Sequence, residues 1–328
     1  MRILGIGNAL VDVLTSLESN DYFEEMGLIK GGMKLINNFE LSKILGIIEQ
    51  KESKLTAGGS ASNTIYGLAG MGIETGFIGS VNNEDKYGQV YKQDLIDNRV
   101  TPLLMNSSKP TGCAMCMITP DGERTMGTFL GAAAEIDHSN FTVDTFKGYD
   151  LLHIEGYLVQ DHSLIEKAFA LAKEAGLKIS IDLASFNIVA NDLEFFQHLV
   201  RNYVDIVFAN EEEAIAYANG TPEEAAELLS KECEIAVVKK GSKGSIIRRG
   251  DEVVEIGVIK VNCVDTTGAG DLYASGFLYG YAKGLTLEQS AKIGAVISGN
   301  VVEVVGPRMD AGRWKEIKTK VDEIIAQK

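Results

Sequence analysis

The chain has 328 residues, 45% of them hydrophobic and only 5 of them proline, so it can bury a full core and lacks the composition of a disordered protein. Its formal net charge of −15 argues against a nucleic-acid-binding surface, because phosphate backbones are held by clusters of Lys and Arg that we do not find in the sequence. The apolar N-terminal run, Arg2 to Gly7, is too short for a signal peptide or a membrane span. We therefore expect a cytoplasmic protein without a nucleic-acid or membrane partner.

Four cysteines, at positions 113, 116, 233 and 263, are too few and too scattered for a disulfide framework. Cys113 and Cys116 form a C-x-x-C pair inside an alternating, strand-like run from Gly112 to Thr119. An odd spacing on a strand puts the two side chains on opposite faces. We therefore favour a structural role for these thiols over zinc or redox chemistry.

The first expected strand, Arg2 to Gly7, is followed by a second alternating run from Val11 to Leu14. Gly5 and Gly7 of the first strand suggest a dinucleotide-binding fingerprint, but Leu10 stands where the third glycine belongs and no helix follows. Asp12 is unusual among the apolar residues of the second run. It is either a solvated carboxylate at the edge of a sheet or a hydrogen-bond acceptor for the hydroxyl groups of a polyol.

Short strands that lie apart from the helical regions predict a small second sheet. They are expected at 11–15, 33–36, 113–119 and 124–130, with a turn at 120–123 between the last two. We expect one domain over residues 1–328, in which residues of about 11–37 and 110–131 form a β lid. A lid of this kind excludes water from the cleft that it covers.

A glycine pair, Gly58 and Gly59, precedes a helix that begins with small residues. Ser60 is the candidate N-cap, and Asn63 is placed to point back toward a ligand near the helix N-terminus. A flexible loop followed by an ordinary helix cap explains the same residues equally well.

From residue 151 onward, apolar strands alternate with amphipathic helices, which predicts a mainly parallel sheet with helices on both faces. The expected strands are 151–154, 178–181, 205–208 and 235–238, and the expected helices are 164–175, 193–200, 211–218, 223–230, 287–305 and 314–325. Ligands of such folds bind beyond the carboxyl ends of the strands. Those ends carry Asp182, Asn210 and Lys239 to Gly241.

Two motifs at this edge of the sheet have both a structural and a functional explanation. Asn210 to Glu213 begins a helix with acidic residues, which the helix dipole stabilises and which also suit water-mediated binding of Mg²⁺ near phosphates. Lys240 to Ser245 is glycine-rich and basic, as expected either for a hairpin turn or for contact with a nucleotide. The chain contains no P-loop motif, so ATP would bind without one.

A β-rich run from Val253 to Val264 leads to the turn Gly268-Ala269-Gly270, after which apolar residues recur at helical spacing. These small residues leave three backbone N–H groups uncovered at a helix N-terminus, which favours a bound anion. Asp271 follows in the first turn, within reach of a hydroxyl presented there. The pattern suggests phosphoryl transfer to an alcohol; an aspartate that merely complements the helix dipole is the structural alternative.

The octet from Val264 to Asp271 resembles the signature of the ribokinase-like (PfkB) carbohydrate and nucleoside kinases, and the likeness extends over essentially the whole chain. Four further motifs resemble landmarks of that family in the same order: 7–12, Gly58-Gly59 with Asn63, Asn210 with Glu213, and Lys240-Gly241 with Gly244. The resemblance implies an α/β, ribokinase-like fold and an ATP- and Mg²⁺-dependent kinase.

The resemblance also implies a role for each motif. Asp271 would be the catalytic base, and the amides of Gly268, Ala269 and Gly270 would hold the charge of the transferred phosphate. The residues expected at the substrate are Asn8, Asp12, Gly59 and Asn63, and those expected at ATP are Asn210, Glu213, Lys240, Gly241 and Gly244. Glu213 would also act on Mg²⁺ through water, and Asp265 with the Thr267 carbonyl would hold a monovalent cation such as K⁺.

Within the family, the stretches 7–12, 30–33, 110–114, 123–125 and 131–134 look most like the adenosine-kinase-like branch, and Gly306-Pro307-Arg308 also fits it. The expected acceptor is the primary hydroxyl of an adenosine-like nucleoside. A sugar such as ribose, fructose or 2-keto-3-deoxygluconate is the alternative, and a non-catalytic binding paralogue is a further one. Met115, Met117 and Phe129 are the candidates for a base pocket. We expect a monomer, or a homodimer formed through an exposed edge of the lid.

Overall fold

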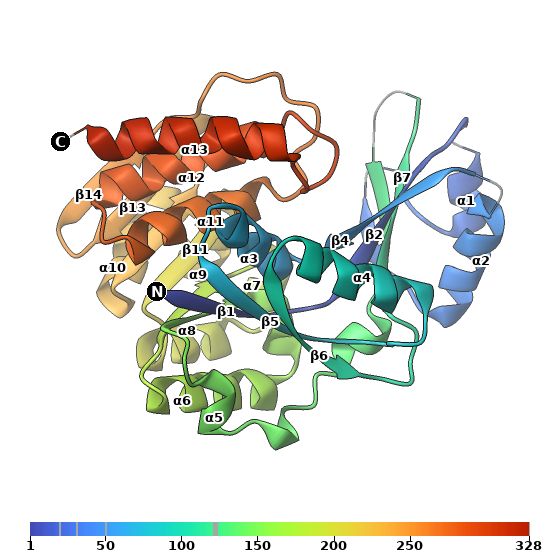
Figure 1. Ribbon diagram of the computed structural model, residues 1–328, viewed down its shortest axis with the longest axis horizontal. Coiled ribbons are helices and arrows are strands. Elements are labelled where there is room, and N and C mark those ends of the chain that lie inside the picture. Colours follow the sequence, from blue (N-terminus) through green and yellow to red (C-terminus); the bar gives the residue numbers. More distant parts are fainter. Residues whose placement is uncertain (20, 31, 50, 121–123, 328) are drawn as a thin grey trace.

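The computed structural model describes residues 1–19, 21–30, 32–49, 51–120 and 124–327 and shows a large α/β body that carries a β lid (Figure 1). The body is built on a nine-stranded sheet, in which β12 to β6 run parallel in spatial order and β13 and β14 extend it antiparallel. In spatial order the strands are β14 (Glu252–Ile256), β13 (Ser245–Arg249), β12 (Ile235–Lys239), β11 (Ile206–Asn210), β10 (Lys178–Asp182), β9 (Leu151–Glu155), β1 (Arg2–Ile6), β5 (Glu74–Val81) and β6 (Val100–Asn106).

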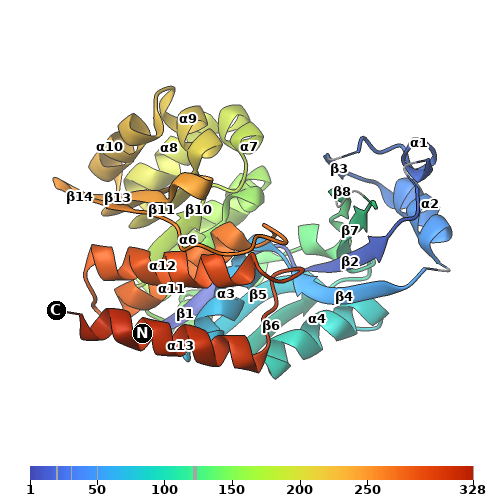
Figure 2. The ribbon, with the colours of Figure 1, turned by 90° about the horizontal axis from the view of Figure 1, so that it is seen from above.

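The large sheet buries apolar side chains on both faces, and each face forms its own hydrophobic core. The helices of one face are α3 (Ser60–Gly70), α4 (Lys86–Asp97), α11 (Ala269–Ala282), α12 (Leu287–Val301) and α13 (Ala311–Ala326). Those of the other face are α5 (Val143–Phe146), α6 (His162–Glu174), α7 (Phe186–Asn191), α8 (Leu193–Asn202), α9 (Glu211–Ala218) and α10 (Pro222–Glu232). Figure 2 shows these two layers on opposite sides of the sheet, as the alternation of strands and helices predicts.

The lid is a separate five-stranded sheet at one end of the body (Figures 1 and 2). Its strands, in spatial order, are β3 (Met33–Leu35), β8 (Arg124–Phe129), β7 (Gly112–Ile118), β2 (Leu10–Ser16) and β4 (Ser53–Gly58). The lid helices are α1 (Tyr22–Met26) and α2 (Asn38–Ile48). Phe23 and Ile44 of these helices are buried in one hydrophobic cluster with Val11, Val13 and Met115 of the sheet.

Strand β4 was not expected, and it changes the interpretation of Asp12. Because β2 pairs with β7 on one side and with β4 on the other, Asp12 lies on an interior strand. The alternative of a solvated carboxylate at a sheet edge is therefore wrong. The lid also includes residues 53–58, outside the expected 11–37 and 110–131. The expected turn at 120–123 falls largely on 121–123, which lie outside the described residues.

The expected strand from Val253 to Val264 is also corrected, since β14 ends at Ile256. Its last pair joins Ile256 to Ser245, the first residue of β13, so the chain beyond Ile256 has no further partner on that strand. Val258 and Val264 are accordingly more than half exposed. A loop therefore connects the sheet to Gly268.

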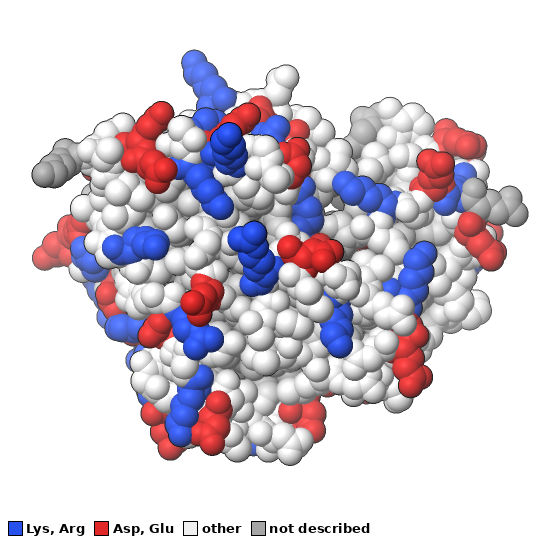
Figure 3. All heavy atoms as spheres, in the orientation of Figure 1, with Lys and Arg blue, Asp and Glu red and all other residues white. Residues whose placement is uncertain are grey.

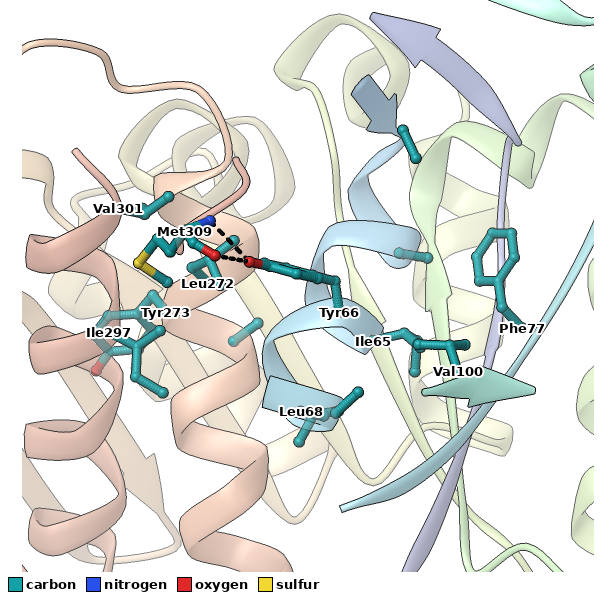
Figure 4. Close-up of a cluster of buried hydrophobic side chains, with 14 of the residues drawn as sticks. Ile65, Tyr66, Leu68, Phe77, Val100, Leu272, Tyr273, Ile297, Val301 and Met309 are labelled. Atoms are coloured by element: carbon teal, nitrogen blue, oxygen red, sulfur yellow. Dashed lines mark hydrogen bonds between the residues drawn. The ribbon is translucent and has the colours of Figure 1, made fainter. Parts of the chain in front are cut away.

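Helices α3 and α11 approach each other closely because a glycine lies at their contact (Figure 4). A Cβ atom added at Gly67 of α3 would lie 2.2 Å from Oγ of Ser275 on α11 and 2.8 Å from Cδ1 of Leu272. On its other side α3 buries Ile65 beneath Phe77 and Val100 of the sheet. The first turns of the two helices are thereby brought together.

The surface shown in Figure 3 carries acidic and basic side chains that are interspersed rather than separated into large patches. Within the described residues, no helix combines the length and the apolar character needed to cross a bilayer.

We predict that Gly67→Ala lowers the free energy of unfolding by about 1–3 kcal/mol, because the added methyl group overpacks the contact between α3 and α11. Gly46→Ala on α2 is the matched control: nothing lies within 4 Å of the added Cβ atom, so this helix-interior change should stabilise the protein by roughly 0.5–1 kcal/mol. Urea unfolding of both variants measures the difference. Equal effects would show that the contact is not tight.

Candidate active site

A cavity of about 870 Å³ lies between the lid and the carboxyl ends of the parallel strands. One wall is the lid sheet, to which β2 contributes Leu10, Asp12 and Leu14. The opposite wall carries Gly268, Gly270 and Asp271 at the start of α11, together with strand-end residues such as Asp182. The site therefore lies where the carboxyl ends of a parallel sheet predict it.

The N-terminus of α11 has the backbone geometry that the sequence analysis expects of an anion-binding turn. Gly268 is the N-cap and has φ +75°, a conformation that a residue with a side chain rarely adopts. A Cβ atom at Gly268 would lie 2.8 Å from Cβ of Pro307, and one at Gly270 would lie 3.1 Å from Nζ of Lys239. Glycine at both positions lets the backbone approach an anion and lets the Lys239 ammonium approach the backbone.

Asp271 occupies the first turn of α11 and faces α3. Its Oδ1 accepts a hydrogen bond from the Ser60 hydroxyl at 2.7 Å, and its Oδ2 accepts one from Nδ2 of Asn63 at 2.9 Å. Gly59 caps α3 and Ser60 is its first residue, so the expected N-cap role of Ser60 is corrected. Burial raises the pKa of Asp271 to about 6, aided by the charge of Asp182 and opposed by the hydrogen bonds from Asn63 and Ser60.

The cavity is strongly acidic around a single cation. Its walls carry six acidic residues, and among the described lining residues Lys239 is the one with a cationic side chain. Nζ of Lys239 lies 2.6 Å from Oδ2 of Asp182. Burial disfavours the charged form of Lys239, but Asp182, Glu213 and Asp271 together keep its pKa above the ordinary value. The ammonium group therefore stays protonated beside the anion-binding turn.

Glu155 is a buried carboxylate that the sequence analysis missed. It ends β9, and its Oε1 accepts hydrogen bonds from N and Nδ2 of Asn8 at 2.9 and 2.7 Å. Its Oε2 accepts one from the Ala61 amide at 2.8 Å, and burial raises the pKa of Glu155 to about 7. Its position at the carboxyl end of a buried strand was the available signal. Glu155 lines the cavity and connects β9 with the segment after β1 and with the first turn of α3.

The expected substrate residues Asn8, Asp12, Gly59 and Asn63 all line the cavity. A Cβ atom at Gly59 would lie 2.2 Å from the Asn8 carbonyl oxygen, so glycine is needed for this approach. Asp12 projects from the lid face opposite Asp271, and a Cβ atom at Gly58 would meet its carboxylate at 2.6 Å. The structure thus brings together residues that are far apart in the sequence.

The lid wall is apolar, but it is formed by other residues than expected. Met115, Met117 and Phe129 are buried in the core on the other face of the lid sheet, which corrects their assignment to a base pocket. Side chains that alternate with these face the cavity: Leu10, Leu14, Met33, Leu35, Cys116 and Met126. Cys113 is buried in the core and Cys116 lines the cavity, so the two thiols lie on opposite faces as the spacing predicts.

The expected nucleotide residues lie at the ends of β11 and β12. Asn210 and Glu213 form a capping box: Oδ1 of Asn210 accepts from the Glu213 amide at 2.9 Å, and Oε2 of Glu213 accepts from the Asn210 amide at 2.7 Å. Both residues line the cavity, and burial together with the charge of Asp182 raises the pKa of Glu213 to about 7. The capping box shows that Asn210 and Glu213 stabilise the start of α9, and their place in the cavity wall is also compatible with water-mediated binding of Mg²⁺.

The segment from Lys240 to Ser245 is the connection of an antiparallel hairpin between β12 and β13. Gly241 lines the cavity, while a Cβ atom at Gly244 would collide with the Ile256 carbonyl oxygen at 1.9 Å. Nζ of Lys240 lies 3.0 Å from Glu223 and 3.4 Å from Glu255, away from the cavity residues. Its neighbour Lys239 is the lysine that faces the site.

The expected cation residues Asp265 and Thr267 are connected to each other. Oδ1 of Asp265 accepts hydrogen bonds from the amide and the hydroxyl of Thr267 at 2.9 and 2.8 Å, and Oδ2 accepts one from the Gly306 amide at 2.6 Å. Asp265 therefore attaches the loop before α11 to the segment after α12. Thr267 also lines the cavity.

Comparison with known proteins agrees with a small-molecule kinase. Residues 37–311 match the model of the family described as "pfkB family carbohydrate kinase". An adenosine kinase from Sinorhizobium meliloti is 34% identical with a TM-score of 0.86, and a probable sugar kinase from Rhizobium etli is 31% identical with a TM-score of 0.87; each comparison covers 97% of this chain and 98% of the other. A 5-dehydro-2-deoxygluconokinase from Shouchella clausii is 28% identical over 81% of this chain and 86% of its own length.

The chain belongs to the pfkB family of carbohydrate kinases. It is a phosphotransferase that acts on an alcohol group of a nucleoside or sugar, and the family implies ATP as the phosphate donor.

We predict that Lys239→Met lowers the free energy of unfolding by about 3–5 kcal/mol near neutral pH, because it leaves the buried carboxylate of Asp182 without its partner. The neighbouring Lys240→Met removes ion pairs to two exposed glutamates and should change stability by less than about 1 kcal/mol. Urea unfolding of the two variants provides the comparison. A small effect at both positions would mean that water or a counter-ion reaches Asp182.

Proposed function

We propose that this protein transfers the γ-phosphoryl group of ATP to the primary hydroxyl of a nucleoside, with adenosine-like nucleosides as the preferred acceptors. The observation that carries the proposal is the position of Asp271. Its carboxylate is half-buried in the first turn of α11, directly after the amides of Gly268 to Gly270, and it lines the cavity. A proton acceptor and an anion-binding turn thus meet at one point.

In the proposed reaction Asp271 accepts the proton of the acceptor hydroxyl. The oxygen of that hydroxyl forms a bond to the γ-phosphorus of ATP, and the bond between the γ-phosphorus and ADP breaks. The amides of Gly268, Ala269 and Gly270 would stabilise the charge on the phosphoryl oxygens, an effect worth roughly 10²–10³ in rate per donor in other enzymes. Lys239 supports the same charge because its ammonium group lies beside Gly270. Closure of the lid would exclude water, which competes as an acceptor.

The donor set of the cavity suits magnesium. Glu213 and Asp182 place carboxylate oxygens near the anion-binding turn, and Mg²⁺ in such sites typically keeps several waters and binds one or two carboxylates together with phosphate oxygens. We propose that Glu213, through water, and Asn210 hold the metal, which when bound neutralises phosphate charge. Gly241, which lines the cavity, completes the proposed nucleotide site; Lys240 and Gly244 belong to the same turn, but the Lys240 side chain is paired outside the cavity. Asp265 with the Thr267 carbonyl is the proposed site for K⁺.

The lid wall favours a nucleoside over a free sugar. Asp12 and Asn63 can bind the hydroxyl groups of a ribose in either substrate. The apolar side chains of Leu10, Met33 and Leu35, however, would stay solvated around a free sugar, and the last two are each more than half exposed. A planar base covers such a wall, and pockets of this kind are mostly apolar with a few polar anchors. A sugar acceptor such as ribose, fructose or 2-keto-3-deoxygluconate remains the alternative, supported by the sugar-kinase relatives.

The proposal is tested by measuring ADP formation in the presence of ATP and Mg²⁺ with one acceptor at a time. The acceptors are adenosine, inosine, ribose, fructose, fructose 6-phosphate and 2-keto-3-deoxygluconate. Selective turnover of nucleosides is the expected result. Selective turnover of one sugar would move the substrate assignment and keep the mechanism. Binding of an acceptor without ADP release would instead indicate a non-catalytic binding protein and contradict the proposal.

For the acceptor that the panel selects, we predict that Asp271→Asn lowers kcat by about 10²–10⁴-fold, the usual contribution of a general base. The amide keeps the size of the carboxylate and removes its charge and its capacity to accept the substrate proton, while one hydrogen bond from Ser60 or Asn63 is lost. The measurement is the initial rate at saturating ATP and acceptor, with unfolding free energies to show that both proteins are folded. Wild-type kcat in the variant would remove Asp271 from the mechanism.

The raised pKa of Asp271 sets the acid side of the pH profile. Its carboxylate must be ionised to accept a proton, and it becomes protonated as the pH falls through about 6. We therefore predict that kcat/KM for the acceptor is level above this pH and falls tenfold per unit well below it. An acid limb near pH 4, the ordinary range of an aspartate, would show that Asp271 is better solvated than the structure indicates.

A further inference from the structure

Arg308 has no assigned role in catalysis or binding, yet its side chain contacts Asn63, and Asn63 in turn contacts Asp271. Its Nη1 donates a hydrogen bond to Oδ1 of Asn63 at 2.9 Å. Its Nε and Nη2 donate to the carboxylate of Asp94 on α4, with Nη2 3.0 Å from Oδ2. The guanidinium carbon lies 4.2 Å from the centroid of the Tyr66 ring. Arg308 is thus held on three sides, and both it and Asp94 are largely buried.

The backbone around Arg308 is fixed as firmly as its side chain. The Tyr66 hydroxyl accepts from the Met309 amide at 2.8 Å and lies 3.0 Å from the Met309 carbonyl oxygen, as Figure 4 shows. Nε1 of Trp314 donates to the same hydroxyl at 3.0 Å. Two residues before Arg308, the Gly306 amide donates to Asp265. The guanidinium group is therefore presented to Asn63 by a rigid segment rather than by a mobile loop.

The orientation of the Asn63 amide follows from these contacts. A guanidinium group has only hydrogen-bond donors, so the atom of Asn63 that faces it must be the oxygen. The NH₂ group is then the part that faces Oδ2 of Asp271, at 2.9 Å. We propose that Arg308 is a positioning residue for the proposed kinase reaction, which holds the Asn63 amide so that it donates to Asp271 and cannot accept from it.

This orientation has a chemical consequence for the base. An amide free to rotate could turn its oxygen to Asp271 and accept a hydrogen bond from the protonated acid, which would stabilise the protonated form. With Arg308 in place, Asn63 stabilises only the carboxylate, the form that accepts the substrate proton. The inference rests on the proposed role of Asp271, because positioning matters for catalysis only if that carboxylate is the base.

Other groups also act on Asp271, and a test must separate their effects from that of Arg308. The ionisable residues around it are Glu155 on β9, Tyr157 after β9, Asp182 on β10, Glu213 on α9 and Lys239 on β12. Asp12 lines the same cavity from the lid. None of these side chains forms the hydrogen bond between Asn63 and Arg308, so a substitution at Arg308 leaves them in place.

The experiment is the pH dependence of kcat/KM for the acceptor in the wild type, Arg308→Met and Arg308→Lys. Arg308→Met keeps an unbranched, apolar stem, removes the guanidinium group and frees the Asn63 amide. We expect its acid limb to move to higher pH by roughly 0.5–1 unit, the scale of one altered hydrogen bond. Arg308→Lys keeps one donor but cannot reach Asp94 and Asn63 with a planar fork, so its limb should fall between the two.

A double-mutant cycle with Asn63→Ala shows whether Arg308 acts through Asn63. In the Asn63→Ala background, Arg308→Met should cause no further shift of the limb. An equal shift in both backgrounds would mean that Arg308 acts through its charge or through general structure, and it would overturn the proposal. Arg313→Met is the matched control, since Arg313 pairs with Glu303 and the Asn300 carbonyl and does not contact Asn63. It should leave the limb unchanged.

A direct titration keeps this test independent of turnover. In protein with ¹³C-labelled aspartate carboxyl groups, the signal lost in Asp271→Asn identifies Asp271, and its midpoint should rise in Arg308→Met as the kinetic limb does. If the wild type turns over no acceptor but the midpoint still moves in Arg308→Met and not in Arg313→Met, the proposed function fails and the positioning by Arg308 stands. An unchanged midpoint in Arg308→Met would overturn the positioning, whatever the activity.

Discussion

The geometry of the site depends on the contact between α3 and α11, because this contact holds the carboxylate of Asp271 between the two helices at the cavity wall. Gly67 allows the two helices to touch, and Ser60 and Asn63 in the first turn of α3 then reach the carboxylate of Asp271 in the first turn of α11. The two hydrogen bonds partly compensate for burial, so the pKa of Asp271 lies near 6 rather than far above it. A carboxylate with this pKa is ionised at neutral pH and can still accept a proton.

The charge of the cavity is a second constraint on the chemistry. Six acidic residues around one lysine repel an anion unless cations accompany it, and ATP carries several negative charges at neutral pH. The site therefore suits a nucleotide that arrives as a metal complex. Burial is the main cause of the raised pKa values of Glu213 and Glu155, and the neighbouring carboxylates Asp182 and Asp271 add to it.

Much of the architecture follows from the sequence alone. Alternating strands and helices predict the parallel sheet. The turn Gly268-Ala269-Gly270 and Asp271 are contiguous in the sequence, so they predict the edge of the sheet at which the site lies without any long-range contact. The lid was harder to predict. Strand β4 has few apolar residues, so its pairing with β2 appears only in three dimensions. The base-pocket candidates were wrong for a related reason: alternation shows which lid residues share a face, but not which of the two faces meets the body.

Residues that act by long-range contact were the least predictable. Arg308 meets Asn63 across 245 positions and Glu155 meets Asn8 across 147, and neither residue belongs to a motif with a known spacing that would pair it with its partner. Both contacts use side chains that are fixed by elements far from the turn of α11. Asp265, through the Gly306 amide, attaches this turn to the same segment that carries Arg308. A displacement of residues 306–309 would therefore reach both the turn at Gly268 to Gly270 and the carboxylate of Asp271, which makes this segment a structural part of the site although it has no reactive group.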